Sequence, residues 1–328
     1  MVFFWIIVFS LTLTLMIKGA DWFLDSAEKI GLSFGLSPFI VGVTIVGMGT
    51  SFPELFASLM AVFENTNEIV VSNVVGSNVS NILLIIGFSA IAGSGLAVTK
   101  NLIDLDLPML VAATVMFLGV SYDGIITVGE SVLLVLAYLV YFMYTIFHKE
   151  TIREKDSVSK KDITSELNTK AHQQLAKKIT ISWKDYAWLV IGILCLIFGA
   201  KFMIQSVIAL SEMFKISPAL ISITAIAIGT SLPELIVSLK AARSGKSEVA
   251  IGNIFGSNAF NSLIVVGIPG LFGTLAIDEQ TFWIGIPTML VATIMFTISG
   301  ISKKIHKWEG AMYLMIYILF IGKIIGFL

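Results

Sequence analysis

Two ten-residue segments of the chain are near copies of each other, separated by 180 positions. Residues 49–58 read GTSFPELFAS and residues 229–238 read GTSLPELIVS, which gives seven identities in ten. Each copy places a proline and a glutamate inside a long apolar stretch. A carboxylate in a membrane span costs roughly 2.5–3.5 kcal/mol on lenient insertion scales, so it indicates a functional site. Two such residues at matching positions of two halves are typical of transporters with internal repeats and broken helices at the binding site.

Apolar stretches long enough to cross a membrane recur along the whole chain. Hydrophobic residues make up 56% of it and charged residues only 13%, against roughly 45–50% and about 25% in soluble domains. We expect an all-α polytopic membrane protein with ten transmembrane helices. The expected spans are 2–27, 37–62, 68–93, 105–121, 125–147, 184–213, 217–241, 247–272, 282–300 and 308–327.

The offset of 180 residues extends well beyond the first motif, so the repeat unit has five spans. An odd number of spans means that the second copy enters the membrane the other way up. We therefore expect a first repeat at residues 1–147, a polar, flexible loop at 148–183 and a second, inverted repeat at 184–328. The further matches are Asn73/Asn253, Gly76/Gly256, Ser77/Ser257, Asn78/Asn258, Asn81/Asn261, Ser37/Ser217, Pro38/Pro218, Gly19/Gly199, Ala20/Ala200 and residues 109–112/289–292.

The distribution of basic residues in the short loops predicts the orientation. Cytoplasmic loops carry an excess of Lys and Arg. With both termini outside, the long loop is cytoplasmic, and the external loops are acidic, with Lys215 as their one basic residue. The short internal connections then carry Lys29, Lys100, Lys240, Arg243, Lys246, Lys303, Lys304 and Lys307.

Each repeated segment predicts a helix break lined by oxygen atoms. Pro53 and Pro233 each remove a helix hydrogen bond and clash with the carbonyl four residues earlier. A break there frees backbone carbonyls at 47–50 and 227–230, which at membrane depth need a cavity or an ion. Hydroxyl, carboxylate and amide oxygens lie near each break, at Thr50, Ser51, Glu54, Ser77 and Asn81 in the first half and at Thr230, Ser231, Glu234, Ser257 and Asn261 in the second.

Ligand sets made only of oxygen suit hard cations. Calcium takes six to eight oxygen ligands in flexible geometry, whereas magnesium prefers small octahedral sites and keeps its water. The sequence offers no paired Cys or His ligands that would indicate zinc or copper. It also offers no nucleophile with a nearby His or Lys in the spans and no HExxH motif, so we do not expect an enzyme.

The doubled GTSxPE and GSNxxN motifs resemble the alpha repeats of the sodium/calcium exchanger family, within the cation/calcium antiporter superfamily. The resemblance covers essentially the whole chain and is strongest to small prokaryotic members. It implies one central divalent site flanked by sodium sites, with Glu54 and Glu234 bridging the ions. The Thr50 and Thr230 carbonyls would complete the calcium site, with Asn81 and Asn261 in the middle.

The same resemblance assigns two mirror-related sodium sites. The Gly47 carbonyl, Ser51 and Ser77 would line one of them. The Ala227 carbonyl, Ser231 and Ser257 would line the other. Several family members carry aspartate where this chain has Asn261, and potassium co-transport in the potassium-dependent relatives is tied to acidic residues there. We therefore expect no potassium requirement.

The resemblance implies a secondary antiporter that exchanges Na⁺ for Ca²⁺ across the cytoplasmic membrane by alternating access. The broken second, third, seventh and eighth spans would form a fixed core, and the first and sixth spans would slide over it. We expect no cofactor and no nucleic-acid partner, and we expect a functional monomer. The alternatives are a proton-coupled or Mg²⁺/Mn²⁺ antiporter on the same scaffold and, from a different class, a cation channel.

Overall fold

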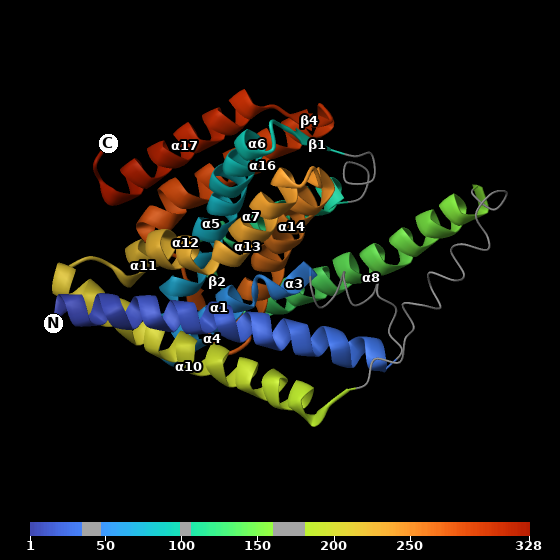
Figure 1. Cartoon of the computed structure of the whole chain (residues 1–328). Coiled ribbons are helices and arrows are strands. Elements are labelled where there is room, and N and C mark those ends of the chain that lie inside the picture. Colours follow the sequence, from blue (N-terminus) through green and yellow to red (C-terminus); the bar gives the residue numbers. More distant parts are fainter. Residues whose placement is uncertain (35–46, 99–105, 160–180) are drawn as a thin grey trace.

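The structure is a computed structural model that describes residues 1–34, 47–98, 106–159 and 181–328, and these residues are mostly helical (Figure 1). Four short strands interrupt the helices. The elements of the first half are α1 (Val2–Ser33), α3 (Gly47–Gly49), α4 (Phe52–Phe63), α5 (Glu68–Val79), the π-helix η2 (Ser80–Ile86), α6 (Gly87–Ala92), β1 (Leu96–Ala97), α7 (Leu107–Val120), β2 (Ile125–Ile126) and α8 (Val128–Ser159).

The second half repeats this order with few changes. Its elements are α10 (Trp183–Phe214), α11 (Pro218–Ile221), the π-helix η4 (Ser222–Ile226), α12 (Ala227–Thr230), α13 (Leu232–Arg243), α14 (Ser247–Phe260), the π-helix η5 (Asn261–Val265), α15 (Val266–Gly270), β3 (Leu275–Ala276), the π-helix η6 (Thr281–Gly285), α16 (Ile286–Ile301), β4 (Lys304–Ile305) and α17 (Lys307–Ile325).

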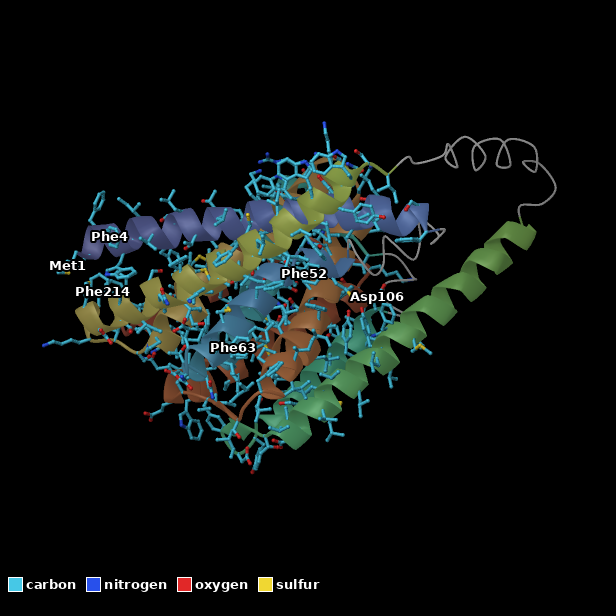
Figure 2. All side chains as sticks on the ribbon, turned by 90° about the horizontal axis from the view of Figure 1, so that it is seen from below. Met1, Phe4, Phe52, Phe63, Asp106 and Phe214 are labelled. Atoms are coloured by element: carbon cyan, nitrogen blue, oxygen red, sulfur yellow. The ribbon has the colours of Figure 1, made fainter. Side chains whose placement is uncertain are left out.

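The two long helices α1 and α10 lie side by side and antiparallel along one flank of the molecule (Figure 1). Figure 2 shows the start of α1, at Met1 and Phe4, beside the end of α10 at Phe214. Glycines allow this close approach, because a Cβ added at Gly192 would lie 2.7 Å from the carbonyl oxygen of Gly19. Small residues bring membrane helices together in this way where no hydrophobic effect drives association.

The centre of the molecule is formed by two helices that are almost fully buried. These are α5–η2–α6 in the first half and α14–η5–α15 in the second. Their sequences are apolar on all sides, which is typical of helices surrounded by other helices. The asparagines and serines expected at the ion site lie on these two helices and on α4 and α13, so the site is far from lipid.

Six helices in the described residues are long and apolar enough to cross a membrane, or seven if one bent pair counts as one span. They are Val2–Gly31, Glu68–Ala92, Trp183–Phe214, Ser247–Gly270, Thr281–Ile301 and Lys307–Ile325, with the bent pair Pro218–Thr230 and Leu232–Arg243. Shorter apolar helices occupy Phe52–Phe63, Leu107–Val120 and Val128–Tyr144. The expected spans 37–62 and 105–121 begin outside the described residues, so the count of ten stays a prediction.

Helix α8 extends into the segment that was expected as a polar loop. A flexible segment was expected from residue 148, but α8 continues to Ser159. Polarity alone predicts exposure to water rather than the end of a helix, and this segment has no proline or glycine to stop it. Residues 160–180 of the predicted loop lie outside the described part of the chain.

Two small antiparallel sheets join the halves. Strand β1 pairs with β4, with Leu96 opposite Ile305, and β2 pairs with β3, with Ile125 opposite Ala276. The helices that follow β2 and β4 begin alike. The Glu130 carboxylate accepts a hydrogen bond from the Thr127 amide at 2.8 Å, and the Glu309 carboxylate accepts one from the His306 amide at 2.6 Å. The two helices therefore begin with the same local structure, although the glutamates are offset by one position from the 180-residue repeat.

Candidate functional site

Helix breaks lie next to both prolines, as the sequence predicts. Helix α3 ends at Gly49 and α4 begins at Phe52, with Ser51 between them at φ −92° and ψ 9°. Helix α12 ends at Thr230 and α13 begins at Leu232, and the two are bent by 43°. Each proline takes a first-turn position of the second helix, where its missing N–H costs nothing.

The two glutamates are fully buried, and each is bonded by a serine from the other half. Ser51 Oγ donates to Glu234 Oε1 at 3.0 Å, and Ser231 Oγ donates to Glu54 Oε1 at 3.3 Å. Ser257 Oγ also donates to Glu234 Oε1, at 3.3 Å. Both carboxylates have an exposed fraction of 0%. The serines at the breaks therefore draw the two halves together around the pair of carboxylates.

Five buried oxygen atoms at this site have no hydrogen-bond partner in the protein. They are Glu54 Oε2, Glu234 Oε2, Asn81 Oδ1, Asn261 Oδ1 and Ser77 Oγ. A buried polar atom without a partner costs several times what a normal hydrogen bond contributes, so such atoms need an explanation. Four of the five are carboxylate or amide oxygens, which only accept hydrogen bonds and are natural cation ligands. No hydrogen-bond donor of the described residues reaches these oxygen atoms, and a bound cation would supply the positive charge that they lack.

A second layer of asparagines holds the amides of Asn81 and Asn261. Asn81 Nδ2 donates to Asn258 Oδ1 at 2.8 Å, and Asn261 Nδ2 donates to Asn78 Oδ1 at 3.2 Å. Asn78 and Asn258 each donate to the backbone carbonyl of the other at 3.4 Å. With both Nδ2 groups bound to this layer, the two Oδ1 atoms are the ends of the amides left for a ligand. Sequence analysis noted Asn78 and Asn258 as repeated residues but assigned them no role.

The threonines of the two motifs differ in their contacts. Thr50 Oγ1 lies 3.4 Å from Ser257 Oγ and 3.5 Å from Asn253 Oδ1. Thr230 Oγ1 donates to the carbonyl of Ile226 at 3.0 Å, within its own helix. The hydroxyl of Thr230 is thus engaged within its own helix, and the ligand role of its carbonyl stays a prediction.

The two expected carbonyl ligands at the start of the motifs lie in short helical segments. Gly47 begins α3, and Ala227 begins α12 and is fully buried. The Ala227 carbonyl already accepts a bond from the Ser231 amide at 3.3 Å. A carbonyl oxygen has two lone pairs, so this bond leaves one position for a ligand.

The third and eighth spans do not break, contrary to the prediction. Each instead widens into a π-helix, η2 at Ser80–Ile86 and η5 at Asn261–Val265, and continues as one helix. The π-helical segments contain no proline like those at the breaks of the second and seventh spans, and Pro269 of the eighth span lies after η5, inside α15. Single turns of π-helix inside α-helices are frequent at functional sites, and here each one contains an asparagine of the site.

Close packing keeps α5 against the broken span of the other half. A Cβ added at Gly76 would lie 2.7 Å from the Ala227 Cβ and would also meet the Ile223 carbonyl. Gly76 therefore allows close contact between the two halves. Through this contact the backbone of α5 lies directly against the break that carries Ser231.

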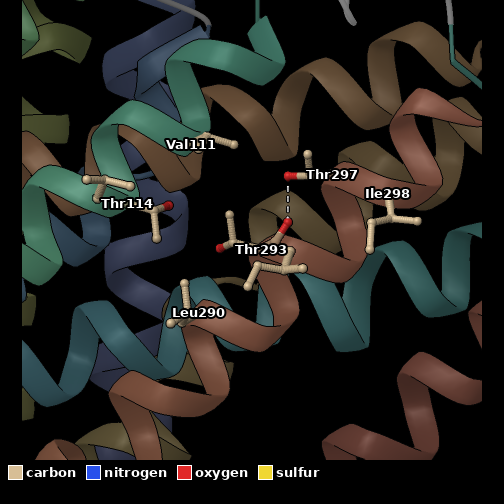
Figure 3. A pocket seen from close by; sticks show the side chains of 8 residues that line it. Val111, Thr114, Leu290, Thr293, Thr297 and Ile298 are labelled. Carbon is tan, nitrogen blue, oxygen red and sulfur yellow. Dashed lines mark hydrogen bonds between the residues drawn. The ribbon is translucent and has the colours of Figure 1, made fainter.

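A separate hollow of about 140 Å³ lies between α7 and α16 and shares no residue with the oxygen cluster (Figure 3). Its polar groups are threonine hydroxyls. Thr114 donates to the Leu110 carbonyl at 2.9 Å and Thr297 donates to the Thr293 carbonyl at 2.7 Å, both within one helix. With these two hydroxyls engaged and no charged side chain in the lining, this hollow lacks the carboxylate and amide oxygens of the cluster.

The oxygen cluster contains two carboxylates and otherwise neutral oxygen atoms. Among the described residues, no group of three or more His, Cys, Asp or Glu side chains could hold a metal ion. The two carboxylates are therefore joined by neutral hydroxyl, amide and carbonyl oxygens. Such a set suits Ca²⁺ or Na⁺ and offers none of the sulfur or imidazole ligands that zinc and copper prefer.

Known proteins resemble this chain over most of its length. A model of the sodium/calcium exchanger protein family matches residues 4–147 and 184–325. The sodium/calcium exchanger MaX1 of Methanosarcina acetivorans is 30% identical over 349 residues, which cover 96% of this chain and 97% of that protein. The inner membrane protein YrbG of Escherichia coli is 29% identical over 286 residues, covering 87% and 85%.

A solved structure has the same fold. The sodium-calcium exchanger NCX_Mj, soaked with 10 mM Na⁺ and 10 mM Sr²⁺, matches with a TM-score of 0.64 and 27% identity over 97% of this chain and 98% of its own. The family match covers both halves and includes both glutamate motifs and both asparagine motifs. The chain therefore belongs to the sodium/calcium exchanger protein family.

Proposed function

We propose that this protein is a secondary antiporter that exchanges Na⁺ for Ca²⁺ across the cytoplasmic membrane. One observation carries the proposal: two fully buried carboxylates and two amides each have an oxygen with no donor in the protein. An uncompensated pair of buried charges is strongly unfavourable. A divalent cation among these oxygens neutralises both carboxylates and gives all four oxygens a partner. The sodium/calcium exchangers MaX1 and NCX_Mj share this fold or sequence pattern.

Competition for shared oxygens would couple the two ions. Ca²⁺ takes Glu54, Glu234 and the central carbonyls and amides. Two Na⁺ ions take the flanking sets, in which Ser77 and Ser257 lie in mirror-related positions. Because the carboxylates belong to both sets, binding of one cargo raises the cost of binding the other. Exchange then follows from electrostatics as well as from steric exclusion.

The two-repeat architecture provides two equivalent ways to open the site. Ten spans in two inverted five-span repeats place Glu54 and Glu234 at matching depths from opposite sides. The crossed bonds Ser51–Glu234 and Ser231–Glu54 support this symmetry. The Asn73–Ser58 hydrogen bond at 3.4 Å and the equivalent Asn253–Ser238 hydrogen bond at 3.1 Å support it as well.

Alternating access would come from movement of α1 and α10 as one unit over the buried core. The glycine contacts that join these two helices support their movement together. Leu24 and Leu13 of α1 cover Gly49 and Gly229, the residues at the two breaks. Sliding of α1 would uncover one break and cover the other. We place both termini outside and the loop 148–183 in the cytoplasm, and we take the monomer as the working unit.

The rival functions differ in what drives calcium movement. A proton-coupled exchanger needs a group that titrates during transport, and Asn261 removes one that an aspartate would supply. A magnesium or manganese exchanger would use the same oxygens with a smaller ion. A channel would conduct calcium without any counter-ion. The oxygen-only set with two carboxylates favours calcium over the smaller ion, because Mg²⁺ keeps its water and demands a rigid octahedron.

The deciding experiment is calcium-45 uptake into proteoliposomes loaded with sodium. The expected result is uptake that requires internal Na⁺ and stops when the sodium gradient is removed. Replacing internal Na⁺ with choline, K⁺ or a proton gradient separates the rival antiporters. Equal calcium uptake with choline inside would indicate a channel and would reject exchange.

A further inference from the structure

A groove of about 360 Å³ lies between α16 and α17. Its apolar walls include Ile298, Trp308 and Met312, whose exposed fractions are 62%, 74% and 59%. Both helices are long and apolar enough to cross a membrane. A groove on the outside of two such helices opens into lipid, and its volume falls in the range of roughly 300–1,000 Å³ that small-molecule sites occupy.

The floor of the groove carries a small polar patch. Tyr313 OH donates to Ser299 Oγ at 2.9 Å, and both residues are buried. Glu309 also lines the groove, and its Oε2 accepts the backbone N–H of His306 at 2.6 Å. The one carboxylate of the groove is therefore engaged as a helix cap.

Three lysines lie in the connection between the two groove helices, at the end of α16 and the start of α17. Lys303, Lys304 and Lys307 are exposed, and Lys307 Nζ lies 5.5 Å from the centre of the Trp308 ring. Within the described residues, the salt bridges are Lys18–Asp21 and Lys29–Asp185. No carboxylate of the described residues forms a salt bridge with these three lysines, and Glu309 is the one carboxylate that lines the groove.

The equivalent turn of the first half has the opposite charge. It joins α7 to β2 and α8, reads SYDGIIT at residues 121–127, and contains Asp123 and no lysine. The backbone is otherwise alike, because both turns lead through a short strand into a helix with a glutamate cap. The basic cluster is therefore specific to one end of the molecule and is not a consequence of the repeat.

We propose that this groove binds an anionic phospholipid. One acyl chain lies along Met295, Ile298 and Met312, and Trp308 packs beside it at the level of the headgroup, where tryptophan is commonly found. The phosphate is held by Lys303, Lys304 and Lys307. Basic residues at a membrane surface each contribute about 1 kcal/mol toward anionic lipid, which is roughly fivefold in affinity for each lysine.

The test is native mass spectrometry of the full-length protein in detergent, with phosphatidylglycerol and phosphatidylcholine of identical acyl chains. The parent protein should retain phosphatidylglycerol at least tenfold better. The triple variant Lys303→Asn, Lys304→Gln and Lys307→Gln should bind the two lipids equally. Asparagine is chosen at position 303 because its φ of +64° favours that residue.

A matched control removes three basic residues from the neighbouring turn of the same end, as Lys240→Gln, Arg243→Gln and Lys246→Gln. This control should keep the preference for phosphatidylglycerol, because these residues lie at the turn between α13 and α14 and not at the turn that joins the two groove helices. Trp308→Ala should reduce retention of both lipids. Soluble glycerol 3-phosphate in millimolar excess should not displace the lipid.

The proposal is overturned if the parent retains both lipids equally, or if the control variant loses the preference as fully as the groove variant. Displacement by glycerol 3-phosphate would point to a soluble phosphate instead and would also overturn it. The lysines changed in the two variants are exposed, so the substitutions should leave the fold intact. Trp308→Ala provides a second measurement, which depends on the apolar wall of the groove. The measurement involves no transport. Lipid binding can therefore be refuted while sodium/calcium exchange is supported, and exchange can be refuted while lipid binding is supported.

Discussion

Replacing Glu234 by glutamine should abolish calcium binding while leaving the fold intact. Glu234 Oε1 accepts bonds from Ser51 and Ser257 at 3.0 and 3.3 Å, and a glutamine amide oxygen can accept the same two bonds. The second oxygen, Oε2, has no donor in the protein. Glutamine puts an NH₂ group there, which points N–H bonds at the cation instead of a lone pair.

The size of the effect follows from the charge that is lost. The variant leaves Ca²⁺ with one buried carboxylate in place of two. Breaking one partner of a buried charge pair costs about 3–5 kcal/mol, which corresponds to a dissociation constant raised by roughly 150- to 5,000-fold. At a calcium concentration about 100 times the parent's dissociation constant, binding stabilises the parent by about 2.7 kcal/mol. The same concentration stabilises the variant by less than about 0.3 kcal/mol.

Thermal unfolding of the purified protein, with and without calcium, measures this difference directly. The ion-free variant should unfold no earlier than the ion-free parent, because one of two neighbouring buried carboxylates is gone. Calcium should raise the unfolding temperature of the parent alone. Glu248→Gln is the matched control, since Glu248 is exposed on α14 and far from the breaks. The reasoning would be refuted if the calcium dissociation constant of Glu234→Gln, derived from the shift in unfolding temperature, lay within threefold of the parent's. Sodium-dependent calcium uptake by the variant at the parental rate would also refute it.

Three further changes test the site, the packing and the topology. Ser77→Ala should change the unfolding temperature little, because Ser77 Oγ bonds no protein group, but should weaken the sodium dependence of calcium uptake severalfold; an unchanged sodium dependence would remove Ser77 from the ligands. Gly76→Ala should destabilise the protein by about 1–3 kcal/mol through overpacking, whereas Gly119→Ala, where an added Cβ meets nothing within 4 Å, should not; thermal unfolding of both variants would expose the opposite order. In a cysteine-free background, a cysteine at Asn65 should react with an impermeant thiol reagent from outside, and one at Ser244 only after the membrane is opened; the reverse labelling would invert the orientation.

The sequence predicted the positions of the breaks because proline acts locally. Pro53 and Pro233 prevent helix hydrogen bonds whatever surrounds them, so the breaks at Ser51 and Ser231 could be expected without a structure. The burial of Glu54 also followed, because the apolar residues around it leave no water at that depth. Local chemistry and membrane depth are both properties that a linear pattern carries.

Partner choice across the two halves could not be read in the same way. Ser231 lies within the same motif as Glu234 but donates to Glu54, and only the packing of the halves decides between the two. The role of Asn78 as a bridge to Asn261 depends on a contact across 183 positions. The π-helical turn at Ser80 was also missed, because no residue type specifies it.

The crossed serine bonds have a consequence for how the protein is made. The hydroxyl that bonds Glu54 belongs to a residue 177 positions later in the chain. At synthesis rates of roughly 5–20 residues per second, about 9–35 s pass between the synthesis of Glu54 and that of its serine partner. During this interval the first half carries a carboxylate at membrane depth without the partner it will later have. Contacts this distant in sequence form slowly, so the nascent first half should be the stage most sensitive to membrane proteases and insertion chaperones.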